Sequence, residues 1–201
     1  MSWVTIIWAM SAAVSLTLGA IHFVLWFQNR KAWANLLFSS AALGVAVFAM
    51  FELSQMRAET AAQFGLLHRW MHPALFVTLV SLVGFILFYF RTGRLWLAWT
   101  VIGLRVVVLI INFTTRPSFN YREITGLLPF RFLGETVSVP VTVQSPWACL
   151  GEGSGLLVLI FVLDASIRLW RRGNSDERRR ALMVGGIERR CATWGVRREC
   201  S

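Results

Sequence analysis

Five long apolar runs constrain this chain more than any other feature of its sequence. They cover about residues 3–27, 33–51, 73–90, 95–113 and 147–170. An α-helix needs roughly 20 apolar residues to cross the hydrocarbon core of a bilayer, and in lipid a helix satisfies its own backbone hydrogen bonds. The sequence therefore predicts an all-α integral membrane protein, a bundle of five transmembrane helices with the start of a sixth near residue 181.

Residues 114–146 make up the one long excursion out of the membrane. Apolar and polar residues alternate over residues 132–143, around Pro140, and this period of two predicts a short β-hairpin that caps the bundle. Such a loop can be a simple lid over the helix ends or a ligand-receiving surface. For the second alternative, the candidate recognition residues are Tyr121, Arg122, Glu123 and Glu135.

Basic residues gather next to alternate ends of the apolar runs. Ten lie at or just after the ends of the first, third and fifth runs, counted as far as residue 180, against five in the other connections. Because positive residues are retained on the cytoplasmic side, we expect the N-terminus outside and the C-terminus inside. Contact with anionic lipid headgroups accounts for the net charge of +10, so the lipid bilayer is the expected partner and nucleic acid is not.

Three ionisable residues away from the ends of the predicted spans stand out, because burial of charge in lipid is costly and such side chains face the protein interior. These are His22 in the first span, Arg105 in the fourth and Asp164 in the fifth. We expect an Arg105–Asp164 ion pair with His22 close to it. Such a pair can pin two helices together, or it can couple events in the outer loop to the cytoplasmic end.

Metal and cofactor sites have little support in the sequence. His68 and His72 are four residues apart, which suits one face of a helix, and they are weak candidates for metal ligands. However, Pro73 is expected to open the third helix, because proline suits a first helical turn, and this places both histidines in a polar connector at 53–72. The three cysteines match neither a zinc nor a disulfide pattern. We therefore expect no metal and no cofactor.

Single glycines occur within three of the spans, at Gly44, Gly84 and Gly103. Small residues allow neighbouring transmembrane helices to approach closely. We expect close helix contacts at these positions.

Several short strings, taken in order, resemble the N-terminal multi-span membrane sensor region of bacterial sensor histidine kinases that contain PAS modules. The strings are AWANLLF (32–38), MRAETAAQF (56–64), LAWTV (97–101), YREIT (121–125), FLGETVSV (132–139), PW (146–147), DA (164–165), WRRG (170–173) and RRRALMVGG (178–186). The resemblance implies a signal-sensing input domain over residues 1–186 in the bacterial inner membrane. It also implies two further spans and cytoplasmic kinase modules after residue 186.

The chain departs from that pattern after residue 186. Residues 187–201 have no apolar period, and we interpret them as a frame change or truncation, or else as a natural short basic tail. The 201 residues contain no phosphoacceptor-histidine helix and no glycine-rich ATP site, so we expect no enzyme activity in them. Apolar surface left unmatched by the lost spans predicts reduced stability or a homodimer.

Three functions stay open at this point. The first is a sensory input module that detects a small-molecule or membrane-derived signal. The second is a small transporter, which calls for polar groups at the membrane midplane and interrupted helices. The third is an inactive gene fragment.

Overall fold

Five helices span the part of the chain that the computed structural model describes, residues 3–132 and 134–172. They are α1 (Trp3–Gln28), α2 (Trp33–Met56), α3 (Ala61–Phe90), α4 (Leu95–Thr114) and α5 (Ala148–Arg172). Each is long and apolar enough to cross a membrane. The predicted all-α bundle of five spans is thus confirmed. The expected sixth span at 181–186 and the tail at 187–201 lie outside the described residues.

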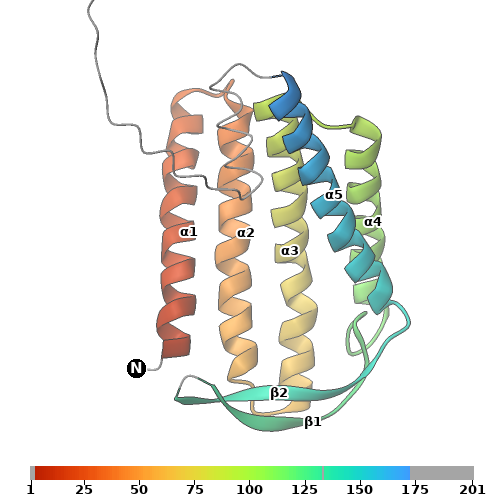
Figure 1. Ribbon diagram of the computed structural model, residues 1–201. Helices are drawn as coiled ribbons and strands as arrows, with labels where there is room; N and C mark the ends of the chain where they lie inside the picture. Colours follow the sequence, from red (N-terminus) through yellow and green to blue (C-terminus); the bar gives the residue numbers. More distant parts are fainter. Residues whose placement is uncertain (1–2, 133, 173–201) are drawn as a thin grey trace, which may run out of the picture.

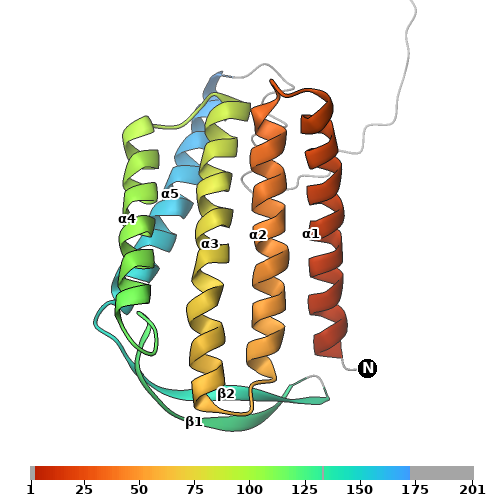
Figure 2. The ribbon, with the colours of Figure 1, turned by 180° about the vertical axis from the view of Figure 1, so that it is seen from behind.

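The helices stand side by side and alternate in direction (Figures 1 and 2). Residues 29–32, 57–60 and 91–94 are short connectors, so consecutive helices from α1 to α4 are antiparallel neighbours. α1, α2 and α3 form a row, and α4 and α5 pack together beyond α3. The strands β1 (Tyr121–Phe132) and β2 (Glu135–Gln144) lie across one end of the bundle. We call this the sheet end; the N-terminus is also there.

α3 is longer than the sequence predicted. We expected it to open at Pro73 after a connector at 53–72, but it begins at Ala61 and Pro73 lies inside it. Its true start carries a capping signal, because the Thr60 side chain accepts a hydrogen bond from the backbone N–H of Gln63. The expected boundary was wrong because proline suits a first turn but does not require one.

Proline has no backbone N–H, so inside a helix it leaves the carbonyl four residues earlier without its helical donor. For Pro73 that carbonyl belongs to Arg69. In lipid an unpaired carbonyl of this kind is costly. Asn112 of α4 supplies the missing donor, since its Nδ2 lies 2.9 Å from the Arg69 carbonyl oxygen. Asn112 is fully buried. A side chain from the neighbouring helix thus replaces the hydrogen bond that the proline removes.

The hairpin agrees with the strand character expected at 132–143 and extends it. β1 and β2 are antiparallel, with Phe132 opposite Glu135 at the turn and Tyr121 opposite Gln144 at the roots. Gly134 in the turn has φ = +81°, a conformation that glycine adopts without steric cost.

The tip of the hairpin is tied to the opposite side of the bundle from its roots. Ser138 of β2 donates a hydrogen bond of 2.6 Å to the carbonyl of Ala58 in the α2–α3 connector. Arg57 in the same connector lies 3.5 Å from the Glu135 carboxylate and donates to the hydroxyl of Thr5 in α1. The hairpin therefore bridges the whole sheet end, from α1 to the start of α5.

A tightly packed apolar core lies between α3, α4 and α5 in the half of the bundle away from the sheet. Its members come from all three helices: Val83, Ile86, Leu97, Ala98, Val101, Val158, Phe161 and Ala165. The same three helices line a polar cavity in their other half, toward the sheet.

The close helix contacts expected at three glycines are present at Gly44 and Gly84 and absent at Gly103. A Cβ built at Gly44 would clash with the Thr78 hydroxyl oxygen and lie 3.1 Å from the Ala74 carbonyl oxygen, so α2 and α3 touch there. A Cβ at Gly84 would lie 3.2 Å from the Leu37 side chain, whereas one at Gly103 would meet nothing within 4 Å. Gly103 therefore makes no close contact inside the bundle.

Candidate functional site

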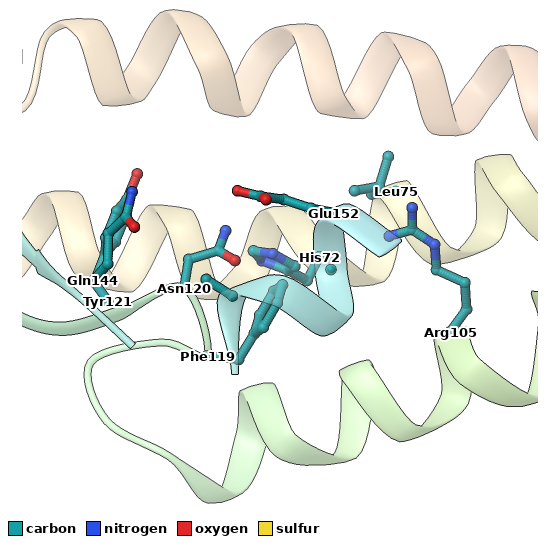
Figure 3. Close-up of a pocket in the computed structure, with 10 residues that line it drawn as sticks. His72, Leu75, Arg105, Phe119, Asn120, Tyr121, Gln144 and Glu152 are labelled. Atoms are coloured by element: carbon teal, nitrogen blue, oxygen red, sulfur yellow. The ribbon is translucent and has the colours of Figure 1, made fainter. Parts of the chain in front are cut away.

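A cavity of about 320 Å³ lies at the sheet end between α3, α4 and α5, against the roots of the hairpin (Figure 3). Its walls combine ionisable, amide and apolar side chains: His72, Leu75, Arg105, Phe119, Asn120, Tyr121, Gln144, Ala148, Gly151 and Glu152. A pocket of this size and mixed lining is typical of a small-molecule site.

His68 stands behind the cavity wall with both ring nitrogens in hydrogen bonds. Its Nδ1 lies 3.0 Å from Oε1 of Gln55 in α2, and its Nε2 lies 3.0 Å from Nδ2 of Asn120. Gln55 Nε2 is 3.2 Å from the sulfur of Met71, which leaves Oε1 to face the histidine. One assignment satisfies every group: Nδ1 donates to Gln55, and Asn120 donates to Nε2. His68 is thus a neutral link between α2, α3 and the hairpin root.

His72 differs from His68 because one of its nitrogens remains available to the cavity. Its Nδ1 donates a 2.8 Å hydrogen bond to the carbonyl of His68, so Nε2 carries a free lone pair. The two rings lie 5.0 Å apart, on one face of α3 as the i, i+4 spacing predicts. The described residues contain no group of three histidine, cysteine or acidic side chains that could hold a metal ion.

Phe119, two residues before the hairpin, wedges between α3 and α5. It is 3% exposed, and its ring packs edge-on against His72 with 4.8 Å between centroids. A Cβ at Gly151 would lie 2.6 Å from the Phe119 ring. Only glycine therefore permits this approach, and the wedge fixes one wall of the cavity.

Arg105 extends from α4 into the deep end of the cavity (Figure 3). The residue is 8% exposed, and its Nε is buried without a hydrogen-bond partner. Its guanidinium lies opposite Gly155 of α5, 3.7 Å from where a Cβ would stand. No carboxylate of the described residues lies within ion-pair distance of it.

The predicted Arg105–Asp164 ion pair is therefore wrong. Asp164 lies 2.9 Å from Arg168 and 3.7 Å from Arg94, at the end of the bundle away from the sheet. The antiparallel register explains the error. If Arg94 faces Asp164, Arg105 is about 16 Å further along α4 at 1.5 Å per residue, which brings it opposite Gly155.

His22 does not join either charge. Its Nδ1 lies 3.0 Å from Oδ1 of Asn35, and its ring packs against Phe38 with 4.1 Å between centroids. These contacts hold α1 to α2, on the side of the bundle away from α4 and α5. The three ionisable residues expected to form one group thus occupy three separate places.

Tyr121 is the one outer-loop candidate that lines the cavity. Its ring lies 4.9 Å from that of His68. Burial raises the pKa of the Tyr121 phenol, and the nearby Glu52 carboxylate adds to the effect. Tyr121 therefore offers the cavity a neutral hydroxyl.

The other three candidates lie elsewhere on the hairpin. Arg122 and Glu123 are exposed, and Glu135 at the tip pairs with Arg57. None of the three lines the cavity.

Sequence reasoning selected three of the ten residues that line the cavity, His72, Arg105 and Tyr121, and missed the other seven. Phe119, Asn120, Gln144, Gly151 and Glu152 line the cavity without belonging to any recognisable motif. One signal was present, since the segment at the start of the fifth span holds the glycines and the acidic residue that a uniformly apolar span would not need.

The fold and the cavity define a class: this chain is a multi-pass α-helical membrane protein with a polar cavity beneath a β-hairpin. Comparisons with models of protein families, with characterised proteins and with solved structures find no match to the chain. The likeness to sensor histidine kinases, which was drawn from short strings, stays a prediction.

Proposed function

We propose that the chain is a sensory input module of the bacterial inner membrane, of the kind that precedes a histidine kinase. In this proposal the N-terminus and the hairpin face outward, because the connectors at the opposite end carry Arg30, Lys31, Arg91 and Arg94. The module binds a small molecule in the cavity and transmits its presence across the membrane. It has no kinase activity of its own.

One observation carries the proposal: the cavity joins the hairpin roots to the first turns of α5. Asn120 and Gln144 stand on one side, and Ala148 and Glu152 on the other. α5 then runs the full length of the bundle to Arg172 at the far end. A ligand that contacts both walls therefore alters the position of a helix that reaches the other side of the membrane.

The start of α5 is suited to such a change. Its first two turns contain three glycines, at positions 151, 153 and 155. Each glycine disfavours a helix by about 1 kcal/mol relative to alanine. The free energy of ordering these turns is thus small, and contacts in the cavity can shift it.

A substitution that fills the cavity tests transmission without a ligand. Ala148→Trp places a large ring in the cavity, and Leu156→Trp places the same ring on an outward face of α5, where Leu156 is 58% exposed. In the full chain in nanodiscs, Ala148→Trp is expected to change amide hydrogen exchange at residues 165–172, and Leu156→Trp is not. Exchange that changes only in the first turns of α5 would overturn the proposal.

The transporter alternative predicts a cavity that opens to both sides in turn. A cysteine-free variant carrying Leu75→Cys, deep in the cavity wall, distinguishes the two functions. A membrane-impermeant thiol reagent is expected to label it from the hairpin side alone. Labelling from both sides would favour transport.

A further inference from the structure

Arg105 poses an electrostatic problem that the described residues do not solve. The residue is more than nine-tenths buried and lies about 14 Å from the end of α4, well inside the membrane. Its guanidinium faces the cavity, and no described residue pairs with it. A cation inside a membrane is stable only when a negative charge or water compensates it.

Neither of the two carboxylates on α5 supplies that charge. Asp164 already pairs with Arg94 and Arg168 at the far end. Glu152 shares the cavity wall, but it is exposed, and its carboxylate points toward the hairpin roots and away from Arg105 (Figure 3). The space in front of the guanidinium therefore suits a negative group that arrives from outside the chain.

The other residues that line the cavity indicate what the rest of the bound molecule must be like. Leu75, Phe119 and Ala148 are apolar, and they line the same cavity as Arg105. His72 Nε2 adds one hydrogen-bond acceptor. A single positive charge with apolar neighbours matches a single negative charge on a short apolar body. A dianion such as phosphate would keep one negative charge that Arg105 does not compensate, and the Glu152 carboxylate in the same cavity wall would repel it.

We infer that the cavity binds a small organic monocarboxylate, whose carboxylate pairs with Arg105 and whose apolar body lies against Leu75 and Phe119. A guanidinium and a carboxylate form two parallel N–H···O bonds, the strongest and most directional pairing available to arginine. This inference rests on the proposed function, because it names the class of molecule that the sensory module detects. The carboxylate can come from water or from membrane lipid.

Calorimetric titration of the full chain in nanodiscs tests the inference. Butyrate represents a water-soluble source, oleate represents a lipid source, and butyramide is the uncharged counterpart of butyrate. We expect butyrate or oleate to bind, and butyramide to bind at least tenfold more weakly than butyrate. Binding by butyrate alone or by oleate alone supports the inference and identifies the source.

Two arginine variants provide the matched comparison. Arg105→Gln is expected to weaken carboxylate binding at least tenfold, and Arg105→Lys is expected to retain part of it. Arg94→Gln, which removes an arginine at the opposite end of α4 and outside the cavity, is expected to bind like the wild type. Glu152→Gln is expected to bind as well as the wild type or more tightly, because a negative charge leaves the wall.

The inference fails if neither carboxylate binds to the wild type, if butyrate binds and butyramide binds as well, or if the carboxylate that binds the wild type binds Arg105→Gln unchanged. The wild-type comparison stands even if Arg105→Gln does not fold. A failure here is separate from a failure of the proposed function, since hydrogen exchange in Ala148→Trp needs no ligand.

Discussion

The hydrogen bond from Asn112 to the Arg69 carbonyl yields the sharpest stability prediction. We predict that Asn112→Ala lowers the free energy of unfolding by about 1–3 kcal/mol, because the carbonyl beneath Pro73 then has no donor. Part of the cost is a cavity, since Asn112 is fully buried. Loss of its Oδ1, which has no hydrogen-bond partner, offsets a little of it.

The cause can be isolated by restoring the backbone donor. In a Pro73→Ala background the new N–H can bond to the Arg69 carbonyl within α3, so Asn112→Ala should cost only its cavity. We expect a coupling energy between positions 73 and 112 of roughly 1–1.7 kcal/mol. This is the upper part of the range for hydrogen bonds between membrane helices, which average about 0.6 kcal/mol.

The measurement is reversible unfolding in mixed detergent micelles, followed by far-UV circular dichroism, for the wild type and all three variants. Thr100→Val is the control, because the Thr100 hydroxyl is exposed and bonds only to the Trp96 carbonyl of its own helix. Its effect should be small. If Asn112→Ala costs the same with and without Pro73, the replacement of a missing backbone bond is not what Asn112 does.

Three further predictions concern single sites. Gly151→Ala should cost about 1–3 kcal/mol of stability in the same assay, because its Cβ displaces the Phe119 ring. Gly153→Ala, with open space around it, should be neutral or stabilising. Equal effects of the two substitutions would contradict the packing of Phe119 against Gly151. In an absorbance titration of phenolate, the transition that Tyr121→Phe removes should lie above pH 10.0, and one at or below that pH would mean that the phenol is not shielded. Asp164→Asn should cost about 1 kcal/mol or less, with a cost that falls as salt rises, because its ion pairs are partly exposed; a large, salt-independent cost would show that they are structural.

The sequence predicted those parts of the fold that depend on local composition. Five apolar runs predicted five membrane helices, and alternation around Pro140 predicted the hairpin. The start of α3 was missed because Pro73 looks like a helix start, and only a partner on another helix, Asn112, makes its interior position tolerable. Local patterns contain no information about such a partner.

The cavity was harder to predict because it depends on register between helices. Arg105 was recognised as an unusual intramembrane charge, but its assignment to Asp164 required knowledge of how far α4 slides along α5. That offset is set by the hairpin and by packing around Phe161, neither of which a residue count reveals. Tyr121 was chosen as a candidate and lines the cavity, whereas Phe119, which lines the same cavity two residues earlier, was not chosen as a candidate.

The path of the hairpin has a consequence for how the protein is made. Four helices leave the ribosome before the hairpin does, and α5 follows it. Ser138 can bond to Ala58 only after the hairpin has crossed the sheet end to the α2–α3 connector, which is synthesised earlier. The wall formed by the hairpin roots and α5 is therefore the last part to be assembled, and a chain interrupted before α5 has four helices in the membrane but no cavity.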